Sequence, residues 1–82
     1  MNLRLPSQIL KMENIKYIVY KEGLHYVSQS LNVDVSSFGT SKEEATNNLI
    51  EALELFFEDD MGKKQYQKIG ETFMGEIDFH IS

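Results

Sequence analysis

Alternation of apolar and polar residues predicts three consecutive β-strands in the first half of the chain. The segments are Ile15–Lys21, His25–Leu31 and Val33–Phe38, which are rich in the β-branched and aromatic residues that suit a pleated, half-buried strand. Glu22–Gly23 supplies a residue that tolerates positive φ, so it predicts a hairpin between the first two strands. Asn32 marks a bend before the third strand.

Two further segments are predicted to be extended. Asn2–Leu10 contains Pro6, which confines it to a sheet edge or to the start of a strand, so residues 1–14 form a candidate N-terminal strand. Phe73–Ile81 alternates strictly and predicts a long final strand with one apolar face. That face carries Phe73, Gly75, Ile77, Phe79 and Ile81.

One long helix is predicted to begin after Ser41. Ser41 and Glu44 have the spacing of a capping box, in which each side chain accepts a hydrogen bond from the other residue's backbone N–H. At about 100° per residue, the apolar residues that follow form one broad stripe, suited to lying across a sheet. The stripe comprises Ala45, Leu49, Ala52, Leu53 and Phe56, and it is widened by Ile50 and Phe57. Gly62 is the expected C-terminal cap.

These elements predict an α+β fold, a two-layer sandwich in which one long helix covers a mostly antiparallel sheet. The expected order is three or four antiparallel strands, then the helix, then a returning strand. A chain of 82 residues has room for one hydrophobic core, so we expect residues 1–82 to form a single domain. Domains this small commonly gain stability by self-association, and we therefore expect a homo-oligomer.

The side chains that catalysis or metal binding needs are scarce. The chain has no Cys, and its two imidazoles, His25 and His80, have no metal-binding spacing. We therefore expect no catalytic residue, no cofactor and no metal; a Mg²⁺-dependent nuclease using Asp34 and the helix carboxylates is disfavoured. No apolar run approaches the roughly 20 residues of a membrane span, and the N-terminal residues lack the apolar stretch of a signal peptide. The sequence thus indicates a cytoplasmic protein that does not bind membranes.

Negative charge is concentrated in the predicted helix. Residues 41–60 hold seven carboxylates and one Lys, a net charge of −6, whereas the whole chain carries −5. Such a surface repels a phosphate backbone, which disfavours direct binding of nucleic acid. Glu51, Glu54 and Glu58 are helical neighbours without a basic partner four residues away. They form either a solvated face that keeps the protein soluble or a ridge that meets a basic partner.

An ordered set of motifs between Tyr20 and Asp59 resembles the HicB family of antitoxins. The set comprises Glu22–Gly23 in a turn, Tyr26–Val27 in a strand, Gly39 followed by Ser41, Glu44–Ala45 opening the helix, and Asn48–Leu55 within it. The final strand Phe73–Ile81 also resembles the closing strand of short, single-domain members. The resemblance covers roughly residues 15–82.

The resemblance implies a partial RNase-H-like fold with a β-β-β-α-β core and no nuclease site. It also implies a partner, a HicA-type toxin, which is a small basic protein that cleaves mRNA and is blocked when the antitoxin covers it. The sequence departs from larger members in having no DNA-binding domain after Ser82, and from the family's usual Cys-Pro or Ser-Pro at Gln29–Ser30. The alternative is a HicB-like domain without a toxin that acts as a homo-oligomeric binding or structural module.

Overall fold

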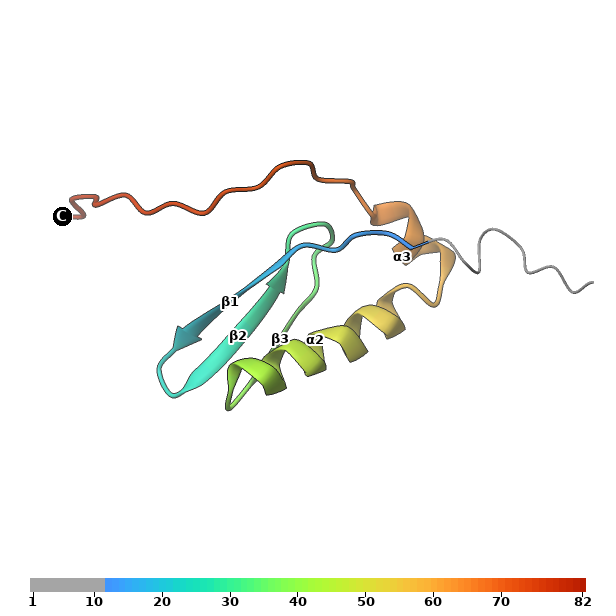
Figure 1. Ribbon diagram of the computed structural model, residues 1–82, viewed down its shortest axis with the longest axis horizontal. Coiled ribbons are helices and arrows are strands. Elements are labelled where there is room, and N and C mark those ends of the chain that lie inside the picture. Colours follow the sequence, from blue (N-terminus) through green and yellow to red (C-terminus); the bar gives the residue numbers. More distant parts are fainter. Residues whose placement is uncertain (1–11) are drawn as a thin grey trace, which may run out of the picture.

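A three-stranded antiparallel sheet with two helices after it forms the body of the molecule (Figure 1). The computed structural model describes residues 12–82. The strands are β1 (Tyr17–Glu22), β2 (His25–Ser30) and β3 (Ser36–Gly39), and the helices are α2 (Lys42–Phe56) and α3 (Asp60–Gln65). The predicted α+β class is therefore confirmed. No helix within residues 12–82 is long and apolar enough to cross a membrane.

The sheet has the order β1-β2-β3, so the three predicted strands are confirmed with shifted bounds. Gly23, at a φ of +63°, forms the two-residue turn with Leu24 between the paired ends Glu22 and His25. The third strand begins later than predicted, because residues 31–34 form bends. In these bends the backbone N–H of Val33 donates to the hydroxyl of Ser30 and not to a neighbouring strand.

Small residues line the side of the sheet that α2 covers. The buried hydroxyl of Ser28 on β2 donates a 2.7 Å hydrogen bond to the carbonyl of Ala45 on α2. A Cβ atom at Gly39 would lie 2.7 Å from the backbone nitrogen of Ala45, closer than such atoms can approach. The helix therefore lies directly against β2 and β3, with much less contact to β1.

The core beneath α2 is small. Within residues 12–82 the buried apolar residues are Val33, Ala45 and Leu49. Ala45 and Leu49 belong to the predicted helical stripe, which confirms its phase. The remainder of the stripe is half-buried, except for Ile50, which is exposed.

Both helices begin at side-chain caps. Ser41 accepts the N–H of Glu44 at 3.1 Å, as predicted, but the Glu44 carboxylate accepts from the N–H and hydroxyl of Thr40 and not from Ser41. The first of these bonds, from the Thr40 backbone, and then the second, from its hydroxyl, lower the pKa of Glu44 below its usual value. At the second helix, Asp59 accepts the N–H of Gly62 at 2.8 Å.

The predicted long helix is confirmed as α2, but its predicted end is wrong, because the chain turns after Phe56 and Asp59 starts a second helix. Gly62 is not the C-terminal cap of a long helix. It is buried inside α3, where a Cβ atom would lie 1.9 Å from the carbonyl oxygen of Phe56. The absence of a side chain at Gly62 allows α3 to fold back against the end of α2.

The predicted final strand is wrong for the single chain. Phe73–Ile81 is extended, but it pairs with no strand and is exposed throughout, so the described chain lacks the strand that would close a β-β-β-α-β core. Figure 1 shows this part of the chain leaving α3 and running to the far end of the molecule. Strict alternation produces an amphipathic segment, but a strand also needs a partner for its backbone groups. The predicted strand Asn2–Leu10 lies outside the described residues.

Candidate partner-binding surface

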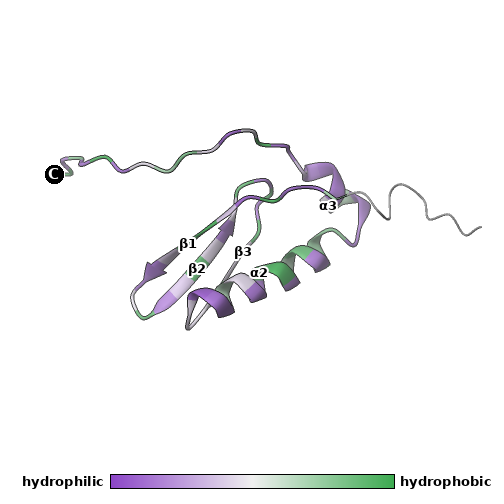
Figure 2. Cartoon of the chain, in the orientation of Figure 1, coloured by the Kyte–Doolittle hydropathy of each residue, from purple (hydrophilic) through white to green (hydrophobic). Residues whose placement is uncertain are grey.

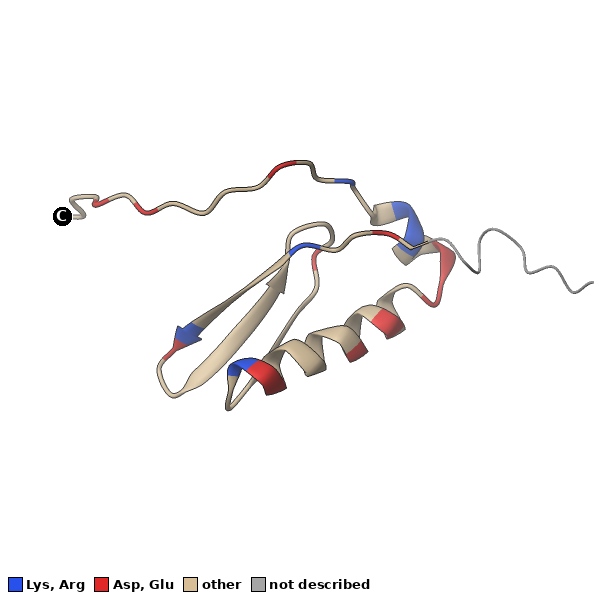
Figure 3. Ribbon diagram, in the orientation of Figure 1, with Lys and Arg blue, Asp and Glu red and all other residues tan. Residues whose placement is uncertain are grey.

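Three exposed carboxylates follow the outer side of α2 and the turn after it. Glu51 and Glu54 lie on α2, whereas Glu58 lies two residues beyond its end, so the predicted set spans a helix and a turn. Figure 3 shows acidic positions along α2 and at the turn into α3. The ion pair found within residues 12–82 joins Lys63 to Asp60 at 3.8 Å and involves none of these three glutamates. We call Glu51, Glu54 and Glu58 the acidic ridge.

A large apolar side chain lies within the acidic ridge. Leu55 is 68% exposed and lies four residues after Glu51, so these two side chains share one surface of α2, and Glu58 follows in the turn three residues later. Leu55 was not predicted as a site residue. Its position outside the buried stripe was the signal that could have identified it, because an apolar residue on the polar side of an amphipathic helix does not serve the core. An apolar centre with a charged rim is the usual composition of a protein-binding surface.

A second surface feature is an open groove of about 1030 Å³ between α2 and the segment that leads into β1, which it meets at Tyr17; we call it the α2–β1 groove. It exists because α2 packs mainly on β2 and β3 and leaves its β1 side uncovered. Much of its lining is apolar, and Glu54 of the acidic ridge stands among its lining residues. The apolar and aromatic lining residues are Met12, Ile15, Tyr17, Leu49, Ile50, Leu53, Phe57 and Tyr66.

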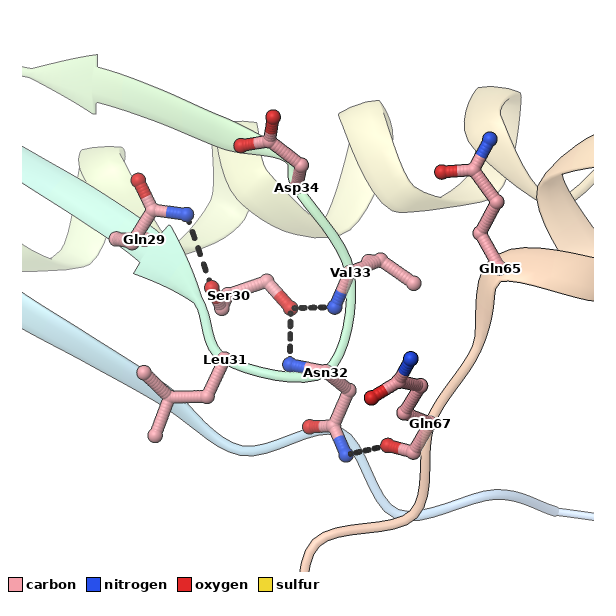
Figure 4. A pocket seen from close by; sticks show the side chains of 8 residues that line it. All are labelled: Gln29, Ser30, Leu31, Asn32, Val33, Asp34, Gln65 and Gln67. Atoms are coloured by element: carbon pink, nitrogen blue, oxygen red, sulfur yellow. Dashed lines mark hydrogen bonds between the residues drawn. The ribbon is translucent and has the colours of Figure 1, made fainter.

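A third feature is a smaller polar pocket of about 370 Å³ at the end of the sheet where β2 finishes (Figure 4). Its polar groups bind one another. The Ser30 hydroxyl accepts the N–H groups of Asn32 and Val33, and the Asn32 amide donates 2.7 Å to the carbonyl of Gln67. The Asn32 side-chain oxygen also accepts the N–H of Lys16 at 2.7 Å. These bonds join the chain after α3 to the sheet, which gives the pocket a structural role.

The residues considered for catalysis lie apart. Asp34 is exposed at the polar pocket, and His80 is exposed near the C-terminus. His25 is exposed on the hairpin, and its ring meets that of Phe38 edge-on at 6.3 Å. Across residues 12–82, no three His, Cys, Asp or Glu side chains are grouped closely enough to hold a metal ion.

Comparisons with known proteins leave the family of the chain open. The chain matches no protein-family model, no curated protein and no solved structure among those compared with it. The resemblance to HicB antitoxins thus rests on the motifs quoted above, and its functional meaning is a proposal.

Proposed function

We propose that this protein is an antitoxin-like inhibitor that binds a small basic HicA-type toxin and covers the surface with which the toxin cleaves mRNA. One observation carries the proposal: Leu55 is exposed at the centre of the acidic ridge, whose carboxylates have no basic partner within residues 12–82. An isolated solvated face would need the charges but would have no use for the leucine.

The chemistry of an RNA-cleaving partner fits this surface. A protein that holds an RNA backbone presents Lys and Arg side chains to the phosphates. A row of carboxylates competes for those same side chains, and its field speeds the encounter of the two proteins. Leu55 would then enter an apolar contact at the centre, where water is excluded and most of the binding free energy arises.

The alternative is a homo-oligomeric binding or structural module without a toxin. The observation that favours it is the apolar C-terminal part of the chain, which the single molecule leaves exposed. The two functions use different surfaces, and they are compatible in one protein.

The test is association with a HicA-type toxin, which is first to be sought as a small basic protein encoded beside the gene of this protein. Replacing Glu51, Glu54 and Glu58 by Gln removes the charge and keeps the shape of the side chains. Association should slow several-fold at low salt and much less at high salt, because ions screen the field of the ridge. The matched control carries the same change at three exposed glutamates elsewhere, Glu22, Glu43 and Glu71, and should slow association far less. Stopped-flow fluorescence measures both rates.

The apolar centre is tested by Leu55→Ala, with Leu24→Ala on the exposed hairpin turn as its control. Leu55→Ala should mainly speed dissociation and weaken inhibition of RNA cleavage, whereas Leu24→Ala should leave both unchanged. Failure of the unaltered protein to bind the toxin would refute the proposal. Equal slowing by the two glutamate triples would assign the effect to net charge and not to the ridge.

A further inference from the structure

The C-terminal segment, Thr72–Ser82, exposes an unusual amount of apolar surface. Phe73, Ile77, Phe79 and Ile81 are each between 80% and 89% exposed. They stand at every second or fourth position, so they would share one side of an extended strand. Figure 2 shows hydrophobic and hydrophilic positions alternating along this part of the chain. A contiguous exposed apolar surface of this kind marks a site of association in a folded protein.

Strand β1 has a free edge that matches an extended segment. The N–H of Leu31, the residue after β2, donates to the carbonyl of Lys16, so Lys16, Ile18 and Tyr20 direct their backbone groups toward β2. Tyr17, Val19 and Lys21 therefore direct theirs away from β2, and no segment of residues 12–82 pairs with them. Unpaired edges of this kind are templates for the addition of another strand.

The α2–β1 groove lies beside this edge. The groove meets β1 at Tyr17 and continues along Ile15 and Met12 before it, so a strand added to this edge would lie beside the uncovered side of the helix. The C-terminal segment would turn its apolar side toward that groove.

Charge complementarity supports the same placement. With the apolar side of the C-terminal segment against α2, its acids Glu76 and Asp78 lie on the opposite side of the sheet. Lys16 lies on that side too, because it alternates with Ile15 and Tyr17, which line the groove. On that side Lys16 stands at one end of β1 and Glu22 at the other, whereas Thr72–Ser82 contains two acids and neither Lys nor Arg, so Lys16 is the basic group that these acids would meet. Opposite charges across paired strands are stabilising.

The residues directly after α3 are held against the sheet by hydrogen bonds. Beyond them, the C-terminal segment runs away from the sheet of its own chain. Gln67 exchanges hydrogen bonds with Asn32, at 2.7 Å through the Asn32 side chain and at 3.3 Å between backbones. The molecule is 67 Å long, and its radius of gyration of 16.4 Å exceeds the roughly 12 Å of a compact domain of this length. An eleven-residue extended segment reaches about 36–40 Å, far enough to cross the body of a neighbouring copy.

We propose that two copies of the chain form a symmetric dimer about a two-fold axis. In this dimer the C-terminal segment of each copy pairs with the β1 edge of the other copy. Each segment buries its apolar side in the α2–β1 groove of the other copy, and both free edges are closed. The exchange and the proposed toxin binding use different surfaces except at Glu54, which belongs both to the acidic ridge and to the groove lining.

The first experiment identifies which copy contributes the segment. Equal amounts of unlabelled and ¹⁵N-labelled protein are mixed, allowed to exchange, and treated with a carbodiimide, which joins Lys to Asp or Glu in direct contact. Peptides containing Lys16 should be joined to peptides containing Glu76 or Asp78, with one light and one heavy member in about half of the products of random mixing. Products that are always uniformly light or heavy would show that each chain covers its own β1 edge, and would overturn the proposal.

The second experiment uses two matched variants, both altered at exposed positions so that the single chain still folds. Ile77→Asp places a carboxylate on the apolar side, and Met74→Asp places one on the other side. Sedimentation equilibrium without toxin should show a dimer for the unaltered protein and for Met74→Asp. Ile77→Asp should raise the dissociation constant about tenfold or more, since a buried carboxylate without a partner is costly. A monomeric unaltered protein at high micromolar concentration, or equal association of the two variants, would refute the exchange and leave toxin binding untouched.

Discussion

Two leucines on α2 differ widely in the exposed fraction of their side chains, and they should therefore differ in what they contribute to stability. Leu49 is 1% exposed against the sheet, whereas Leu55, one and a half turns later, is 68% exposed within the acidic ridge. Leu49→Ala should lower the free energy of unfolding by about 2–5 kcal/mol, because it removes buried methyl groups and leaves a cavity. Leu55→Ala should change it by less than about 0.5 kcal/mol. Urea unfolding at low micromolar concentration, followed by circular dichroism, measures both.

The comparison is matched in residue type, substitution and helix, so intrinsic helix propensity cancels between the two variants. A similar loss of stability from both would show that Leu55 is packed in the protein in solution. It would then be unavailable as the centre of a binding surface.

At the same scale, the apolar part of the core was predictable from the sequence and the polar part was not. Helical spacing placed Ala45 and Leu49 on the buried side. The burial of Ser28 gave no such signal, because small polar residues usually lie at the surface. Its burial depends on the carbonyl of Ala45, seventeen residues away, which accepts a hydrogen bond from the Ser28 hydroxyl. A contact of that kind follows only once the helix has been placed on the sheet.

At the scale of elements, the N-terminal cap of α2 makes the folding stability of the chain depend on pH. Hydrogen bonds from Thr40 keep the pKa of Glu44 below its usual value, so the folded chain binds this proton less tightly than the unfolded chain. The stabilisation is therefore complete above the unfolded pKa, about 4.3 for Glu, and is lost as the pH falls through the lower folded value. A two-dimensional NMR titration of the Glu44 side-chain carboxyl carbon should show a midpoint below the usual value for Glu.

The matched variants are Glu44→Gln and Glu43→Gln, on neighbouring positions in the first turn of α2. Removing the Glu44 carboxylate should flatten the fall in melting temperature between pH 5 and the folded pKa, whereas removing Glu43 should leave the slope closer to that of the unaltered protein. A titration midpoint of Glu44 at or above the usual value for Glu would contradict the capping geometry.

The elements also show what local sequence determines. Strands β1 and β2, their turn at Gly23 and the start of α2 were predictable, because alternation, a positive-φ residue and a cap act within a few residues. The division between α2 and α3 was not predicted. Asp59 is the N-cap of α3, but the acidic residues around it and the Gly62 that follows are also typical of the C-terminal end of a helix.

At the scale of the whole molecule, the acidic ridge was predictable from composition and spacing, but the α2–β1 groove was not. The groove depends on the lateral position of α2 over the sheet, which favours β2 and β3. The prediction of a final strand at Phe73–Ile81 was wrong for a related reason. Its alternation was visible, but its partner must be supplied by tertiary or quaternary structure, which a single strand's pattern does not encode.

The small core has a thermal consequence. Unfolding the single chain exposes little apolar surface, because within residues 12–82 only Val33, Ala45 and Leu49 are buried apolar residues. An ordinary domain of 82 residues has a heat-capacity change of about 1.0–1.2 kcal/mol/K, and this chain should fall below that range when monomeric. Its stability would then vary only gently between refrigerated and warm conditions. Calorimetry at increasing protein concentration should show the heat-capacity change rising toward the ordinary range as copies associate, and a concentration-independent ordinary value would contradict this expectation.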